Sequence, residues 1–259
     1  MLLAIDVGNT QTVVGLYGNG DRSHELVDHW RIATKAERTC DEHALLFQEF
    51  LVFAGHNWKT DVAGIAISSG VPMVTFELRR MCERYLGLEP IVLGTGVKTG
   101  MPVLYDNPKE VGADRIANAV GAFDLYGGPT IVVDFGTATT FDVISAKGEY
   151  LGGAIVPGIE ISLDALFGRA AALRRVELIE PRSVVGKTTV ESVQSGTIYG
   201  YSALVDGMCD RIEEEIGEAT VIATGGLADL IAPVAESIEH TEPWLTLHGL
   251  RLIWEKNRV

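Results

Sequence analysis

Hydrophobic and polar positions alternate along the first third of the chain in a way that separates strands from helices. Residues 2–7, 11–17 and about 24–32 are short apolar runs joined by turns rich in Gly, Asn and Asp, which predicts an antiparallel meander. Residues 39–55 change to helical periodicity, with Thr39 and Glu42 at capping-box spacing and Gly55 at the end. A buried strand (VAGIAISSG), an amphipathic helix (MVTFELRRMCERYLG) and another strand (PIVLG) follow, so we expect an α/β domain.

The second half of the chain repeats this order. A stretch rich in Gly and Pro, residues 94–112, is long enough to be a functional loop. A helix to about Tyr126 is followed by strands near 130–135, 139–145 and 149–156, then by helices and the buried strand TVIATGG. A constant separation of 128 positions aligns Asp6, Gly8 and Thr12 with Asp134, Gly136 and Thr140. We therefore expect two α/β domains of similar topology, residues 1–117 and 118–259.

The duplicated corner has the chemistry of a phosphate cradle. A strand that ends in Asp and Gly and then reverses exposes several backbone N–H groups, and glycine lets an anion approach them closely. Asp6 and Asp134 would repel phosphate directly but could hold cations between themselves and phosphate oxygens. Asp-x-Gly is also ordinary turn chemistry, and its recurrence in both halves favours the functional interpretation. Two such corners facing an interdomain cleft would grip different phosphates of one nucleotide, and the strand before Gly225 and Gly226 could approach its adenosine.

Charge and composition narrow the partners. The chain carries 35 acidic and 21 basic residues, a formal net charge of −14, which disfavours nucleic acid and anionic membranes. We expect neither a signal peptide nor a membrane-spanning helix, because the first residues lack a basic region followed by a long apolar stretch and no apolar run approaches roughly 20 residues. The widely spaced Cys40, Cys82 and Cys209 suit reduced thiols, and the six histidines have no zinc-ligand spacing. We therefore expect a cytoplasmic protein with neither nucleic-acid nor membrane partners.

The segment YDNPKEVGADRIANAVGAF contains a candidate general base. Asp114 could accept a proton from a substrate hydroxyl that attacks a γ-phosphate. A structural alternative is that Asp114 caps the helix that continues through Arg115, and that Arg115 pairs with a nearby acid. Spacing alone leaves both interpretations open.

Motifs distributed in order along the chain resemble those of type III pantothenate kinases. Gly112-Ala113-Asp114-Arg115 and GGAIVPG, residues 152–158, are the most specific of them. The others are Asp6-x-Gly8-Asn9-Thr10, Asp134-x-Gly136-Thr137-Ala138-Thr139-Thr140, GKTTVESVQSG (186–196), Thr224-Gly225-Gly226 and the ending LTLHGLRLIWEKN. The resemblance implies an α/β fold of two ribonuclease-H-like domains around an interdomain cleft, as in the actin-like ATPase superfamily of sugar and acetate kinases, chaperones and actin.

The same resemblance implies ATP-dependent phosphorylation of pantothenate to 4′-phosphopantothenate, the first step of coenzyme A biosynthesis. Asp114 would be the catalytic base, and Asp134 would bind a monovalent cation, potassium or ammonium, while magnesium would accompany ATP near Asp6. ATP would contact Asp6, Val7, Gly8, Asn9, Thr10, Gln11, Thr12, Val13 and Thr137. Pantothenate would contact Tyr105, Gly112, Ala113, Asp114, Arg115 and Thr189.

Family members are homodimers with the substrate pocket at the subunit interface, so the helix at about 190–216 becomes a candidate interface, although it could equally be a core helix. Tyr105 could instead be a packing aromatic residue, and Thr189 could be a helix N-cap. Two other functions remain open: another small-molecule kinase of the superfamily, or an ATP-binding regulatory protein.

Overall fold

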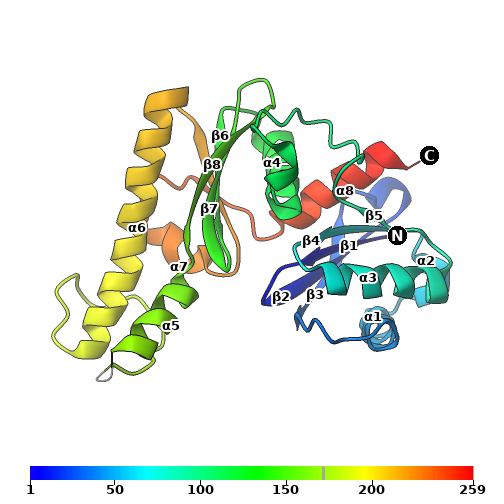
Figure 1. The fold of residues 1–259 in the computed structure, drawn as a ribbon, viewed down its shortest axis with the longest axis horizontal. Coiled ribbons are helices and arrows are strands. Elements are labelled where there is room, and N and C mark those ends of the chain that lie inside the picture. The colour runs from blue at the N-terminus through cyan, green and yellow to red at the C-terminus, as the bar shows by residue number, and fades with distance from the viewer. Residues whose placement is uncertain (171–172, 259) are drawn as a thin grey trace. The chain divides into compact units, whose positions relative to one another are not determined.

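The computed structural model describes residues 1–170 and 173–258, which divide into two compact units (Figure 1). Unit 1 comprises Met1–Met101, Asp106–Gly121 and Leu245–Val259, and unit 2 comprises Pro102–Tyr105 and Ala122–Trp244. The expected division at residues 117 and 118 differs from this one, because the last helix packs on the first sheet and residues 102–105 join the second.

Unit 1 is built on a five-stranded sheet in the order β3-β2-β1-β4-β5. Its strands are β1 (Leu2–Val7), β2 (Gln11–Tyr17), β3 (Leu26–Ala33), β4 (Gly64–Ser69) and β5 (Ile91–Val92). The first three form the predicted antiparallel meander, and β4 lies parallel to β1. Alternate β1 residues Leu3, Ile5 and Val7 join the hydrophobic core with residues of β2, β4 and the helices α1 (Cys40–Phe53) and α3 (Pro72–Met81).

Unit 2 repeats this topology. Its sheet has the order β10-β9-β6-β7-β8, with strands β6 (Thr130–Phe135), β7 (Ala138–Ile144), β8 (Tyr150–Pro157), β9 (Thr220–Thr224) and β10 (His240–Thr241). The meander is again antiparallel, and β9 again lies parallel to the opening strand. Even the irregularity in the second strand recurs, at Leu16/Tyr17 and at Val143/Ile144. The predicted duplication of the architecture is confirmed.

Helices α1 (Cys40–Phe53) and α3 (Pro72–Met81) pack together in unit 1, and the short α2 (Trp58–Asp61) lies between them in the chain. Thr39 and Glu42 form the predicted capping box at the start of α1. The chain continues from α3 into a π-helical turn, Cys82–Leu86, which ends at Gly87 in the left-handed conformation.

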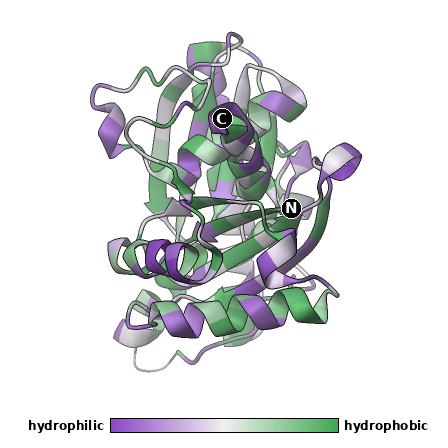
Figure 2. Cartoon of the chain, turned by 90° about the vertical axis from the view of Figure 1, so that its right-hand side faces the viewer, coloured by the Kyte–Doolittle hydropathy of each residue, from purple (hydrophilic) through white to green (hydrophobic). Residues whose placement is uncertain are grey.

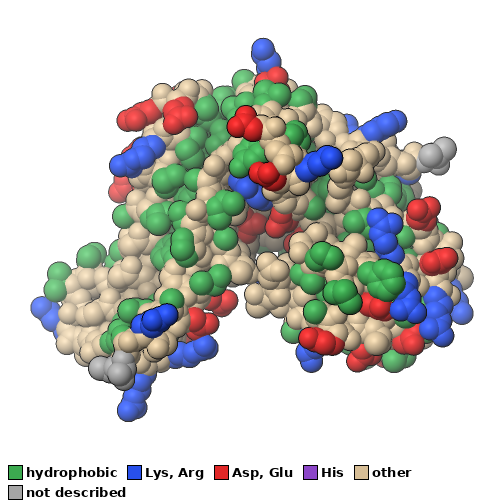
Figure 3. Space-filling model, viewed as in Figure 1, with side chains coloured by type: hydrophobic (Ala, Val, Ile, Leu, Met, Phe, Trp, Pro, Cys, Tyr) green, Lys and Arg blue, Asp and Glu red, His purple; other side chains and the backbone are tan. Residues whose placement is uncertain are grey.

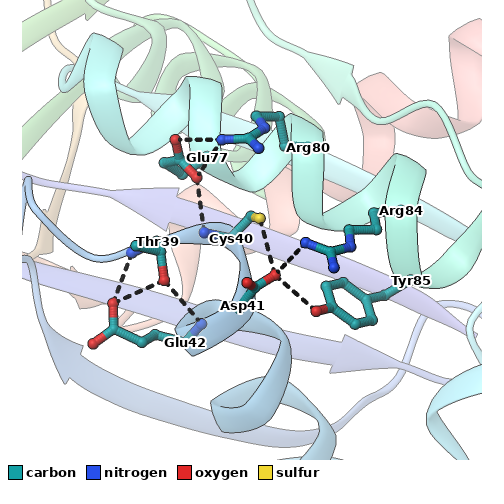
Figure 4. A network of polar contacts seen from close by, with 8 residues as sticks. All are labelled: Thr39, Cys40, Asp41, Glu42, Glu77, Arg80, Arg84 and Tyr85. Atoms are coloured by element: carbon teal, nitrogen blue, oxygen red, sulfur yellow. Dashed lines mark hydrogen bonds and ion pairs between the residues drawn. The ribbon is translucent and has the colours of Figure 1, made fainter.

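A polar network ties the beginning of α1 to α3 and the turn that follows it (Figure 4). The Cys40 N–H donates to Glu77 Oε2 at 2.8 Å. Asp41 Oδ1 accepts from Arg84 Nη1 at 2.8 Å and from the Tyr85 hydroxyl at 2.7 Å. The hydroxyl and the neighbouring guanidinium lower the pKa of the Asp41 carboxyl from its usual value. These bonds fix the end of α1 that follows β3.

Small residues let α8 (Leu245–Asn257) and the first half of α4 (Ala113–Tyr126) pack closely in unit 1. A side chain at Gly249 would collide with the Ala117 carbonyl, and one at Gly64 of β4 would lie 2.5 Å from the Trp254 ring. Helix α8 packs on β1, β2 and β4. The helix that carries Asp114 is therefore held by backbone-to-backbone contact with α8.

The helices of unit 2 are α5 (Ile159–Arg169), α6 (Thr189–Ile216) and α7 (Ala228–Ile231). They enclose a second hydrophobic core with β6, β7 and β9, and Figure 2 shows the strands as predominantly hydrophobic ribbons.

Short 3₁₀ turns occupy Gly20–Arg22, Pro108–Glu110 and Ala232–Val234. Across the described residues, none of the helices has both the length and the apolar character that crossing a bilayer would require.

Candidate functional site

The β1–β2 corner carries eight of the predicted ATP-binding residues. Strand β1 ends at Val7, Gly8–Gln11 make the turn, and the Gly8 N–H donates to the Gln11 carbonyl at 3.0 Å. The side chains of Asn9, Thr10 and Gln11 are exposed, whereas Thr12 is buried. The corner therefore presents polar side chains and backbone to solvent from a rigid two-strand base.

Thr34, the residue after β3, fastens this corner. Its hydroxyl donates to the Gly8 carbonyl at 2.7 Å and lies 2.8 Å from the Thr12 hydroxyl. Its N–H donates to the Thr10 carbonyl at 2.9 Å. Sequence reasoning did not single out Thr34, because only the pairing of β2 with β3 brings it to the corner.

Asp6 lies beside a buried hydroxyl in unit 1. Its neighbour across β1 and β4 is Ser68, and paired residues in a sheet point to the same face. Ser68 is 1% exposed and its Oγ has no hydrogen-bond partner in the protein. A buried hydroxyl without a partner is costly, so this oxygen is suited to a water, a cation or a phosphate next to Asp6.

The β6–β7 corner of unit 2 is one residue shorter than its counterpart. Phe135 pairs with Thr139, whereas the equivalent Val7 pairs with Thr12 across a longer turn. The predicted equivalence of Thr12 with Thr140 is therefore wrong: Thr139 is the counterpart, because the shorter turn removes one position from the alignment. Thr139 is fully buried, and its hydroxyl has no partner in the protein.

Asp134 at the end of β6 lies against the glycine turn that follows β9. A side chain on Gly225, whose φ is +93°, would come within 2.5 Å of Asp134 Oδ1 and 2.7 Å of the Phe135 backbone. Only glycine fits this position, because φ is positive there and because a side chain would collide with these atoms. The TVIATGG segment thus brings its backbone against a carboxylate, a contact that sequence reasoning did not anticipate. Whether the backbone there also approaches adenosine stays a prediction.

Asp114 is the second residue of α4, and its carboxylate is exposed. Its Oδ1 accepts the Arg115 N–H at 2.8 Å, and the Gly112 carbonyl accepts the Ile116 N–H at 3.2 Å. A side chain at Gly112 would collide with Oδ1. Asp114 thus lies within the first turn of α4 and is not the N-cap that the structural alternative expected, and its carboxylate faces solvent. Arg115 beside it is 9% exposed.

The long loop from Gly94 to Gly112 crosses from unit 1 to unit 2 and back. Residues 102–105 add to the sheet of unit 2 through a parallel bridge between Val103 and Tyr150. The half-buried Tyr105 ring lies 6.4 Å from that of Tyr150. Tyr105 therefore packs against another aromatic ring, as the packing interpretation expected, and its substrate role stays a prediction.

Thr189 is the exposed first residue of α6. The interpretation of Thr189 as the N-cap is wrong, because Thr188 is the cap and its hydroxyl accepts the Glu191 N–H at 3.1 Å. This frees the Thr189 side chain from the capping role. The predicted sites thus divide between the units: residues 6–13 and 112–115 lie in unit 1, and Tyr105, Asp134, Thr137 and Thr189 lie in unit 2.

Comparison with known proteins gives a family match along most of the chain. A family model described as type III pantothenate kinase matches residues 2–211. A protein of Streptomyces avermitilis named type III pantothenate kinase is 55% identical over 265 residues, which cover 99% of this chain and 98% of that protein.

Two solved structures share the fold at low sequence identity. An inorganic polyphosphate/ATP-glucomannokinase from Arthrobacter sp. strain KM superposes with a TM-score of 0.50 and 14% identity over 99% of both chains. An activator of 2-hydroxyisocaproyl-CoA dehydratase from Clostridium difficile, solved with bound ADPNP, gives 0.51 and 12% over 98% of this chain and 94% of that one. These similarities confirm the predicted fold, two ribonuclease-H-like domains of the kind found in actin-like ATPases and sugar kinases.

Proposed function

The chain belongs to the type III pantothenate kinase family, whose reaction is ATP-dependent phosphorylation of pantothenate to 4′-phosphopantothenate in coenzyme A biosynthesis, and we propose which of its residues carry out each part of that reaction. The observation that carries the proposal is an exposed carboxylate, Asp114, held at the start of a helix in a chain that also has two Asp-x-Gly strand corners. The corners bind phosphates, and the carboxylate accepts the proton of the substrate hydroxyl.

ATP phosphates bind at both corners. The β1–β2 corner offers exposed amide and hydroxyl donors from Asn9, Thr10 and Gln11, together with the backbone around Gly8. The exposed Thr137 supplies the equivalent contact from the β6–β7 corner. Basic and acidic side chains are both dispersed over the face shown in Figure 3, and in a chain of net charge −14 such local donors are the means of holding an anion.

Magnesium would be held near Asp6. The carboxylate and the partnerless Ser68 hydroxyl beside it are the oxygen donors that this cation prefers, and ATP would provide further oxygens. When bound, magnesium would neutralise charge that develops on the transferring phosphoryl group. The contribution of Asp6 is to hold it, directly or through water, next to the corner.

Asp114 acts as the general base. A carboxylate is an effective base in phosphoryl transfer when it lies within hydrogen-bond reach of the attacking hydroxyl and needs no large rearrangement. The Arg115 N–H fixes Oδ1, and the close contact between α4 and α8 fixes the helix beneath it. Gly112, Ala113, Arg115, Tyr105 and Thr189 contact pantothenate.

Asp134 binds a monovalent cation, potassium or ammonium. Its carboxylate lies against the backbone at Gly225, where carboxylate and backbone oxygens are the appropriate ligand types for a weakly charged ion. Replacing potassium and ammonium by sodium at constant ionic strength should lower turnover. Unchanged activity in sodium would contradict a selective site.

The active form is a cytoplasmic homodimer. Several exposed hydrophobic side chains lie on α5, between α5 and α6, and at the start of α6 next to Thr189, and exposed apolar side chains favour association when they form a contiguous patch. They are Ile161, Leu166, Ile179, Val184, Val185 and Val190. Sedimentation analysis of the purified chain tests the dimer, and Val185→Asp should weaken it.

The deciding experiment is the formation of 4′-phosphopantothenate from pantothenate and ATP in potassium buffer with magnesium. Asp114→Asn should lower kcat by at least about 100-fold and leave ATP binding intact, because a general base contributes roughly that factor. Asp124→Asn, on the same helix, is the matched control and should retain activity. Turnover by Asp114→Asn at the wild-type rate would refute the base.

Another small-molecule kinase activity is the second candidate, since the glucomannokinase shares the fold. Assays of a panel of hydroxylated substrates with ATP distinguish this activity from pantothenate phosphorylation. Faster phosphorylation of a sugar than of pantothenate would identify the sugar as the substrate. A regulatory protein that only binds ATP would show no turnover with any of them.

A further inference from the structure

Residues 102–105 are fastened to one residue of unit 2, Tyr150. The Tyr150 N–H donates to the Pro102 carbonyl and the Leu104 N–H donates to the Tyr150 carbonyl, both at 2.8 Å. With the isolated bridge between Val103 and Tyr150, these bonds hold the segment beside the first residue of β8. The position of Tyr105 therefore depends on how firmly Tyr150 is held.

Tyr150 is in turn anchored by a buried carboxylate. Its hydroxyl donates to Asp142 Oδ1 at 2.7 Å, and the Thr140 hydroxyl donates to Asp142 Oδ2 at 3.2 Å. Both Tyr150 and Asp142 are 0% exposed. A hydrogen bond to a charged or polar group inside a protein is directional and expensive to break, so the phenol is fixed in one orientation.

The anchored ring bears directly on Tyr105. The centroids of the two rings are 6.4 Å apart, with their planes tilted by 54°, within the range of a favourable aromatic contact. Gly152 on the same strand has a φ of +131°, and a side chain there would contact the Tyr105 ring at 3.6 Å. Tyr105 therefore lies against the Tyr150 ring and against Gly152, which has no side chain.

We propose that Asp142 and Tyr150 are positioning residues for pantothenate, which hold Tyr105 and residues 102–105 in the substrate-binding arrangement. The proposal rests on the proposed role of Tyr105 as a pantothenate contact. Asp142 acts through Tyr150, and Tyr150 acts through its ring and its two backbone hydrogen bonds. Neither residue belongs to the ATP-binding set.

Steady-state kinetics of Tyr150→Phe test the proposal. This variant keeps the ring and removes the hydroxyl, so KM for pantothenate should rise about 5- to 10-fold, while KM for ATP and kcat stay within about 2-fold. Tyr126→Phe is the matched control, because Tyr126 also donates to a carboxylate of unit 2, Glu242 Oε1, at 2.5 Å. Equal effects of both substitutions on KM for pantothenate would overturn the proposal.

Two variants at Asp142 separate positioning from simple stability. Asp142→Asn keeps an oxygen that can accept from Tyr150 and should leave KM for pantothenate within about 2-fold of wild type. Asp142→Leu removes the carboxylate that accepts from the phenol and should reproduce the increase seen with Tyr150→Phe. An increase with Asn as large as that with Leu would contradict a role for the hydrogen bond.

Amide hydrogen exchange of the substrate-free protein gives a readout that does not depend on the reaction. In Tyr150→Phe the Leu104 amide should exchange at least about 10-fold faster than in wild type, and in Tyr126→Phe it should not. Unchanged exchange at Leu104 overturns the proposal even in an active enzyme. If wild-type protein fails to phosphorylate pantothenate, the proposed function fails, while the exchange experiment still decides whether this anchor holds the segment.

Discussion

The two strand corners have the same topology but are fastened by different means. In unit 1, the Thr34 hydroxyl bridges the Gly8 carbonyl and the Thr12 hydroxyl. In unit 2, the equivalent position after the third strand is Gly158, the N-cap of α5, where the backbone itself packs against the corner. A side chain there would come within 2.6 Å of the Gly136 carbonyl and closer still to that of Thr137.

This difference shows how one strand topology can carry two corners that are held by different chemical groups. In unit 1 a side-chain hydroxyl bridges the groups of the corner, whereas in unit 2 direct backbone contact brings the N-terminus of α5 beside Thr137. The two copies also leave different buried hydroxyls without a protein partner, Ser68 in unit 1 and Thr139 in unit 2. The copies have therefore kept the strands and changed the oxygen and nitrogen groups around the turn.

The largest effect is expected from Gly158→Ala. The added carbon has no space because its neighbours are backbone carbonyls, so we expect a loss of more than about 3 kcal/mol in the free energy of unfolding. Gly168→Ala, near the end of the same helix, meets no atom within 4 Å and should be neutral or stabilising by up to about 1 kcal/mol. Urea denaturation measures both, and equal stabilities would show that unit 2 is not fastened by this contact.

The buried imidazole of His43 should make the stability of unit 1 sensitive to acid. His43 on α1 is 1% exposed, neither ring nitrogen has a hydrogen-bond partner, and burial lowers its pKa from 6.5 to about 4. Between these values the unfolded chain binds a proton that the folded protein does not. Stability should therefore be fully present above about pH 6.5 and fall by up to about 3 kcal/mol as the pH drops to about 4.

Tryptophan fluorescence during urea unfolding can follow this change, since Trp30, Trp58 and Trp254 all lie in unit 1. His43→Phe should flatten the dependence between pH 6.5 and pH 4, and pH 8 is the reference at which the wild-type imidazole is neutral in both states. An equal loss of stability in acid with and without His43 would contradict the assignment.

The smallest effects come from the counterpart threonines. Thr12→Val removes one of the two hydrogen-bond partners of the Thr34 hydroxyl and should cost about 1 kcal/mol of unfolding free energy. Thr139→Val removes a buried hydroxyl that has no protein partner, so the ligand-free protein should be equally stable or slightly more so. If a ligand uses that hydroxyl, ATP titration by calorimetry will show weaker binding. A destabilised Thr139→Val protein without ligand would disprove the contrast.

Local chemistry allowed much of each unit to be predicted from the sequence. The capping box at Thr39 and Glu42, the helix end at Gly55 and the meanders follow from short-range periodicity and turn residues. The two-residue strand β10 was not predicted, because two residues carry no period. The equivalence of Thr12 with Thr140 was wrong because a fixed spacing along the chain assumes turns of equal length, and the β6–β7 turn is one residue shorter than the β1–β2 turn.

The sequence by itself determined the duplicated architecture, the family and the residues that carry its motifs, since these depend on order and spacing along the chain. Only the tertiary structure decided what fastens each corner, which hydroxyls lack a protein partner, that α8 returns to unit 1 and that Asp142 anchors Tyr150 beneath Tyr105. Each of these contacts joins residues on separate strands, helices or segments. Their energies depend on distances and burial that no local pattern encodes.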